Sequence, residues 1–141
     1  MTSKWVLIVT FICSFGLAAC SSHKLKTELS ADQRFLDVAA NPKQFEGKEV
    51  TFRAWITLRH EDKNLWATMS DGENWETLRC VSLINYDSLD GRKRDLDGRM
   101  VEVTGTIVSD ASEGGTIIRL GACRDVAIEI SGPSAIKLVI P

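Results

Sequence analysis

The chain has 141 residues, of which 17 are basic and 19 are acidic, so its formal net charge is −2. This length provides for one domain and is too short for two domains with separate cores. The charge balance disfavours generic nucleic-acid binding, which draws most of its affinity from neutralised phosphates.

The first nineteen residues have the form of a secretory signal. Met1 to Lys4 is a short head with one positive charge, and Trp5 to Gly16 is an almost unbroken apolar run. A charged head followed by an apolar core is typical of an export signal. The alternative is a permanent membrane anchor, but the apolar segment is shorter than the roughly 20 residues that a spanning helix needs.

Leu17-Ala18-Ala19-Cys20 resembles the lipobox of bacterial lipoproteins, and the resemblance covers residues 1–22. In that family small residues fit the signal peptidase, and the cysteine thiol receives a diacylglycerol. The resemblance therefore implies that Cys20 becomes the lipidated amino terminus of a protein in the bacterial cell envelope. Ser21 stands where a signal for inner-membrane retention usually has Asp, which implies the periplasmic face of the outer membrane in a Gram-negative host.

Residues 20–29 are expected to form a polar, flexible, lipidated linker to a domain that spans residues 30–141. A diacyl anchor with an additional amino-terminal acyl chain exceeds what stable membrane attachment requires. Removal of the signal peptide takes Lys4 with it and changes the net charge to −3.

The domain begins with a predicted helix. Ser30 is the expected N-cap and Gln33 reaches back from the third helical position, the pattern of a capping box. Apolar residues between Phe35 and Ala39 give one face, and Asn41-Pro42 ends or bends the helix.

From Gly47 onward the hydrophobic period changes to two, which is typical of strands with one buried face. In the first strand the apolar residues Val50, Phe52, Ala54, Ile56 and Leu58 alternate with Thr51, Arg53, Trp55, Thr57 and Arg59. Further strands are predicted at 65–69, 77–84, 99–108 and 116–120, with extended alternation continuing over 126–130 and an edge strand over 136–140. Asp71-Gly72 is a turn signal, and 86–96 is a polar connector with one helical turn.

Two entries into strands share an apolar-acidic-Gly-basic pattern, at 45–52 and at 96–103, either as a repeat or as two ordinary turns. These entries and their order resemble the small OB-fold (tRNA-anti-like) domains of bacterial envelope proteins over residues 35–130. The residues that carry the resemblance are Asn41-Pro42, Phe45, Gly47-Lys48, Val50 and Gly98-Arg99-x-Val101-x-Val103-x-Gly105. The resemblance implies a mostly β fold, a five-stranded OB-like barrel with an N-terminal helix. A small antiparallel β-sandwich is the alternative.

Two cysteines remain in the domain after Cys20 is acylated and another leaves with the signal. In an oxidising envelope such a pair, Cys80 and Cys123, most often forms a structural disulfide. A metal site lacks supporting ligands, because His23 lies in the linker and His60 is alone, and there is no redox CxxC motif.

The outer face of the first three strands is the usual ligand surface of an OB barrel. Here it would display Arg53, Trp55 and Arg59, with Trp66 on the neighbouring strand. Aromatic planes flanked by cations stack on bases, sugars or other planar groups. The alternative is that the helix at 30–40 or the carboxy-terminal tail covers both tryptophans.

The sequence has no Ser/His/Asp spacing, HExxH motif, phosphate loop or dinucleotide fingerprint. We therefore expect a non-enzymatic, lipid-anchored envelope protein without a cofactor, whose OB-like domain binds a protein partner or an envelope glycan. The alternative is an oligonucleotide or small-ligand binding module that uses the same face, although the negative charge and the export signal argue against nucleic acid.

Overall fold

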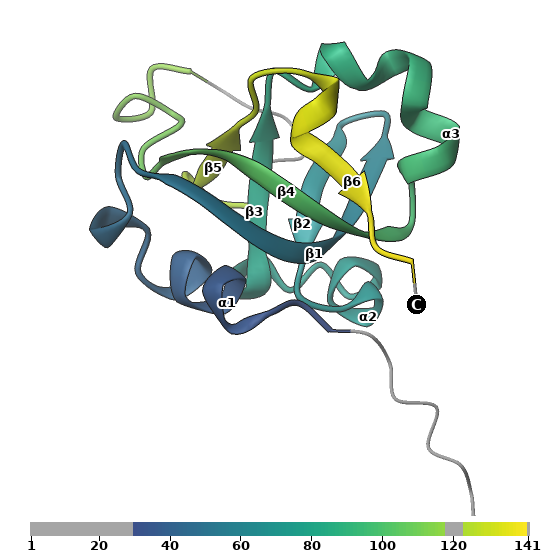
Figure 1. Ribbon diagram of the computed structural model, residues 1–141. Coiled ribbons are helices and arrows are strands. Elements are labelled where there is room, and N and C mark those ends of the chain that lie inside the picture. Colours follow the sequence, from purple (N-terminus) through teal and green to yellow (C-terminus); the bar gives the residue numbers. More distant parts are fainter. Residues whose placement is uncertain (1–29, 118–122, 141) are drawn as a thin grey trace, which may run out of the picture.

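The computed structural model describes residues 30–117 and 123–140 (Figure 1). The predicted signal peptide, the linker and Cys20 lie outside these residues. Within the described ranges, no helix is long and apolar enough to cross a membrane.

Five strands close into a barrel. They follow the order β1-β2-β3-β5-β4, and β4 also pairs with β1. The β3–β5 pair is parallel, and the other pairs are antiparallel. The structure thus confirms the predicted five-stranded OB-like barrel with an N-terminal helix. The barrel strands are β1 (Glu49–Arg59), β2 (Asp62–Trp66), β3 (Cys80–Ile84), β4 (Arg99–Val108) and β5 (Ala127–Glu129).

A sixth strand and several short helices surround the barrel. Strand β6 (Ile136–Leu138) pairs with the first half of β4, on the same edge of β4 that pairs with β5 in its second half. The predicted strand in the carboxy-terminal tail is thus confirmed. The α-helices are α1 (Gln33–Ala40), α2 (Met69–Glu73) and α3 (Lys93–Leu96), and the 3-10 helices are η1 (Pro42–Gln44), η2 (Thr77–Arg79), η3 (Tyr86–Arg92) and η4 (Pro133–Ala135).

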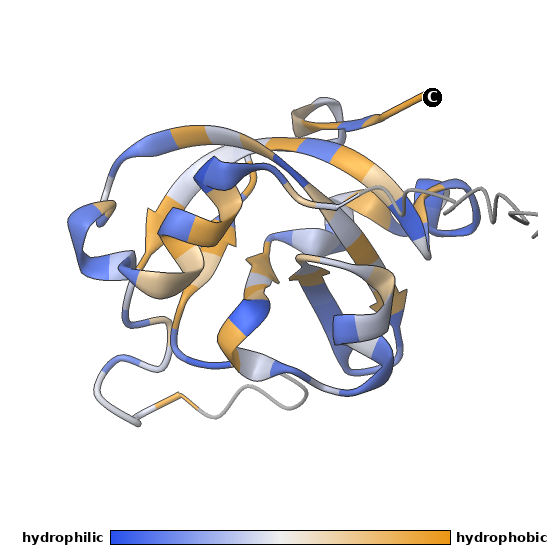
Figure 2. Cartoon of the chain, turned by 90° about the horizontal axis from the view of Figure 1, so that it is seen from below, coloured by the Kyte–Doolittle hydropathy of each residue, from blue (hydrophilic) through white to orange (hydrophobic). Residues whose placement is uncertain are grey.

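The barrel interior is filled by the inward residues of β1 and β4 together with the apolar face of α1. Phe52 of β1 and Phe35 of α1 are both buried and meet edge to face, with ring centroids 5.2 Å apart. Figure 2 views the molecule from below and shows the apolar positions along the barrel strands in orange. The period-two pattern of β1 therefore places its apolar set in the core, as predicted.

The start of α1 differs from the prediction, because Asp32 and not Ser30 is its N-cap. One carboxylate oxygen of Asp32 accepts a hydrogen bond from the Phe35 backbone N–H at 3.0 Å. The other accepts from the Arg53 backbone N–H, also at 3.0 Å. Asp32 thus satisfies a free helix donor and fastens α1 to β1 with a single side chain.

The two similar strand entries have the same backbone geometry. Gly47 and Gly98 both have positive φ, 68° and 69°, a conformation that glycine adopts without steric cost. Each donates a backbone hydrogen bond of 2.9 Å to the paired strand, Gly47 to Ile107 and Gly98 to Ile56.

Barrel closure depends on a different glycine. A Cβ on Gly105 of β4 would overlap the backbone carbonyl oxygen of Glu129 and lie 2.8 Å from Cγ1 of Ile128. Strands β4 and β5 therefore approach each other more closely than a side chain would allow.

Three predicted elements between β1 and β4 have different bounds. The second strand runs over 62–66 instead of 65–69, because the Thr68 hydroxyl accepts from the Asp71 backbone N–H at 3.0 Å and caps α2. The turn predicted at Asp71-Gly72 consequently lies within α2. The third strand begins at Cys80, preceded by η2, and the polar connector contains both η3 and α3.

The prediction of a fifth strand at 116–120 is wrong for its first two residues, which are the part of this range that the structure describes. Thr116 and Ile117 belong to a turn and bend, and residues 118–120 lie outside the described residues. The fifth barrel strand, β5, lies instead within the extended alternation predicted over 126–130.

Candidate ligand-binding cleft

A cleft of about 100 Å³ lies on the outer surface of the barrel. Its walls come from the outward side of β1, from β2 and from α2. The polar and aromatic residues that line it include Trp55, Thr57, Arg59, Asp62, Trp66 and Glu73, and Met69 adds an apolar side chain. This surface is the one on which the sequence predicts a ligand face.

Trp66 is buried, with 1% of its surface exposed, which agrees with the alternative that the tryptophans are covered. Its ring lies 5.3 Å from the ring of Trp75, which follows α2. Gly72 allows α2 to approach, because a Cβ there would lie only 3.2 Å from the Trp66 indole. The α2 segment therefore covers the Trp66 indole, which the sequence did not predict.

The other three predicted face residues have different positions. Trp55 is partly buried and packs against the cluster that Trp66 forms with the two domain cysteines. The Arg59 Nε lies 3.1 Å from an Asp97 carboxylate oxygen. Arg53 is exposed on the same strand but does not line the cleft. The structure thus brings together Trp55, Arg59 and one wall made by Trp66.

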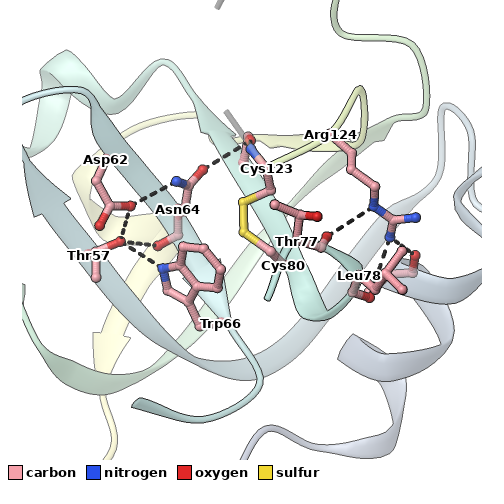
Figure 3. The surroundings of a disulfide bond; sticks show 11 residues. Thr57, Asp62, Asn64, Trp66, Thr77, Leu78, Cys80, Cys123 and Arg124 are labelled. Atoms are coloured by element: carbon pink, nitrogen blue, oxygen red, sulfur yellow. Dashed lines mark hydrogen bonds between the residues drawn. A yellow bond between two sulfur atoms is a disulfide. The ribbon is translucent and has the colours of Figure 1, made fainter. Parts of the chain in front are cut away.

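A chain of hydrogen bonds fixes the polar floor of the cleft (Figure 3). The Thr57 hydroxyl donates to Asp62 at 2.6 Å, and the Asn64 amide donates to the same carboxylate oxygen at 2.8 Å. The Ser82 hydroxyl donates to the Asn64 side-chain oxygen, Oδ1, at 3.0 Å and accepts from the Cys123 backbone N–H at 3.1 Å. The chain crosses from β1 to the segment before β5.

Trp66 joins this network at the Thr57 hydroxyl, which accepts from the indole Nε1–H at 2.9 Å. A buried indole N–H needs such a partner. Because the polar groups and the indole hold one another in place, the cleft is positioned by strands and not by loops alone.

The predicted disulfide is confirmed, and it lies behind the cleft. Cys80 and Cys123 are bonded across 43 residues of sequence with a Cα–Cα distance of 5.7 Å. Cys80 is the register partner of Trp66 in the β2–β3 ladder, so the bridge packs against that indole. Arg124 then extends the link, since its guanidinium donates to the carbonyl oxygens of Thr77 and Ala39 (Figure 3).

Two ionisable groups outside the cleft, one carboxyl group and one amine, have shifted pKa values. Hydrogen bonds from the Ser109 side chain and backbone lower the pKa of Glu46, and a hydrogen bond to Asp90 raises the pKa of Lys93. Among the described residues, no three His, Cys, Asp or Glu side chains are grouped as a metal site. The side chains that line the cleft offer stacking, apolar contact and hydrogen bonding.

Sequence reasoning missed several cleft residues. Thr57 has the same outward parity as Trp55 and could have been included on that basis. Met69 and Glu73 could not be found in this way, because the segment that carries them was assigned to a strand and a turn.

Comparison with protein-family models, with curated proteins and with solved structures finds no match to this chain.

Proposed function

We propose that this protein is a lipid-anchored component of the bacterial cell envelope, attached to the membrane through Cys20. In a Gram-negative host it lies on the periplasmic face of the outer membrane. Its OB-like domain binds a protein partner or an envelope glycan in the cleft and catalyses no reaction. The observation that carries this proposal is the partly exposed Trp55 beside fixed polar groups on the ligand side of the barrel.

The size of the cleft supports a macromolecular ligand. Its volume of about 100 Å³ is below the roughly 300–1,000 Å³ of typical small-molecule pockets. A cleft of this size takes one protruding group and leaves the rest of the ligand outside. A side chain of a protein, or one sugar ring of a longer glycan, meets this condition.

The chemistry of the lining supports the same classes of ligand. The Trp55 indole offers an apolar plane, and Asp62 offers acceptor oxygens whose direction is fixed by Thr57 and Asn64. An apolar plane with oriented polar groups is the usual arrangement for specific recognition. Oligonucleotide binding has less support, because Arg59 is paired with Asp97.

Site-specific photocrosslinking tests the proposal. A photoreactive amino acid replaces Trp55 in the cleft or, as a control, Thr51, which is exposed on the same face of β1 but outside the cleft. Irradiation of intact cells is expected to give a discrete adduct from position 55 and none from position 51. A glycan ligand would instead change the tryptophan fluorescence of the purified protein when soluble peptidoglycan fragments are added. Equal adducts from both positions, or neither adduct nor fluorescence change, would contradict the proposal.

A further inference from the structure

Three large exposed hydrophobic side chains lie within ten residues of one another. Met69 in α2, Trp75 just after it and Leu78 in η2 have exposed fractions of 47%, 45% and 69%. We call these three residues the α2 apolar edge. Exposed large hydrophobic side chains that gather in one segment mark contact with a protein or a membrane.

The chain enters the domain next to this edge. The Ala31 backbone N–H donates to the Ala67 carbonyl oxygen at 2.7 Å, two residues before α2 begins. Figure 1 accordingly shows the start of the described chain and α2 on the same lower side of the barrel. Whatever holds the chain upstream of Ser30 is thus attached on the side of the apolar edge.

The proposed anchor is close to this side. Ser30 follows Cys20 by ten positions, a distance of at most about 35 Å when the chain is fully extended. A domain of this size has a radius of gyration of about 13 Å. The anchor therefore confines the domain to within about one of its own diameters from the lipid.

We infer that the α2 apolar edge rests on the membrane surface, with Trp75 at the level of the lipid headgroups. This inference rests on the proposed lipid anchor. Indole rings are enriched at the membrane interface, because they are apolar with one polar N–H. Since the anchor makes the contact intramolecular, a small apolar surface is sufficient to hold it.

The charges around the edge specify the lipid surface. Glu73 and Glu76 are exposed beside Trp75, whereas Asp71 is paired with Arg79 at 3.0 Å. Within the described residues neither glutamate has an ion-pair partner, and both repel an anionic surface at low salt. A zwitterionic surface is therefore the one that the edge fits. Because Met69 also lines the cleft, a ligand bound there lies beside the bilayer.

Quenching by brominated lipids tests the inference on the full lipidated protein in phosphatidylcholine vesicles. Flotation of the vesicles first shows whether the protein is anchored. In the anchored protein, we expect brominated chains to quench tryptophan fluorescence, and we expect Trp75→Phe to lose most of that quenching. Buried Trp66 and partly buried Trp55 remain as internal references.

A matched pair of variants separates the edge from the rest of the surface. Leu78→Ser is expected to reduce the quenching of Trp75. Ile117→Ser is expected to leave it unchanged, since the loop that carries Ile117 lies at the opposite upper end of the barrel in Figure 1.

The outcomes distinguish the two proposals. Flotation without quenching, or equal quenching in the wild type and in Trp75→Phe, would overturn the membrane contact and leave the anchor intact. If Trp75 is already protected from aqueous iodide before vesicles are added, another segment of the chain covers the edge. That result would also overturn the inference. Failure to float would overturn the anchor and this inference with it.

Discussion

Removal of the disulfide is the perturbation whose effect on stability follows most directly from the structure. The double variant Cys80→Ala/Cys123→Ala opens a loop of 43 residues. The loop-entropy relation gives a loss of about 4 kcal/mol in the free energy of unfolding at 25 °C. Both cysteines are buried, with exposed fractions of 0% and 6%, and they contact Trp66. The variant therefore also loses packing, which adds to the entropic loss.

This loss is large relative to the roughly 5–15 kcal/mol by which domains are stable. For a domain of this length, each kcal/mol corresponds to about 3–5 °C in Tm. The variant is thus expected to melt roughly 15 °C below the wild type. It should also unfold at a lower urea concentration and with a steeper slope, because its unfolded chain is less compact without the crosslink.

Urea unfolding followed by circular dichroism measures the difference. Cys20 is retained in both proteins, so the proposed anchor is the same. Wild-type protein unfolded in the presence of a reductant is a second control and should lose a similar amount of stability. A difference below about 1 kcal/mol would refute the reasoning, as would reaction of both cysteines with maleimide in unreduced, denatured protein.

Three further predictions concern other parts of the barrel. Gly105→Ala should destabilise by about 2 kcal/mol or more, because the added Cβ overlaps the β5 backbone; an unchanged urea midpoint would contradict the close approach. Phe52→Ala should lower the free energy of unfolding by about 3–5 kcal/mol, and Trp55→Ala should lower it by less than half as much, because Trp55 is only partly buried. Equal losses in the two variants would show that both side chains belong to the core. Glu46→Gln should destabilise at neutral pH, because Ser109 lowers the pKa of Glu46. That difference in stability should disappear as the pH falls through the lowered pKa. A difference that persists in acid would show that the charge of the Glu46 carboxylate is not its cause.

The two long strands were predictable because their alternation continues for ten or more residues. A one-residue shift in such a strand would move every apolar side chain to the solvent, so the inward set is fixed by sequence alone. Strand β4 has the predicted bounds, and β1 begins one residue before the predicted alternation, at Glu49. The disulfide was predictable by elimination, since Cys80 and Cys123 were the remaining pair.

The cover of the cleft was not predictable, because the alternation of Leu65, Ala67 and Met69 continues past the end of the strand. A side-chain cap by Thr68 turns the chain into α2 and brings Trp75 onto Trp66. Thr68 followed by an acidic residue three positions later is a local signal of a cap, but the competing strand pattern outweighed it. The position of β5 depends on parallel pairing with β3, a contact between distant segments that no local pattern encodes.

Mass spectrometry of the amino-terminal peptide tests the central claim most directly, because both the proposed function and the membrane contact depend on the anchor. We predict that the mature protein begins at Cys20 with a diacylglyceryl group on the thiol and an acyl chain on the amine. We also predict that the variant Cys20→Ser accumulates as the full-length precursor without fatty-acid label. A mature protein that begins elsewhere without lipid, or fatty-acid labelling that persists in Cys20→Ser, would contradict the account.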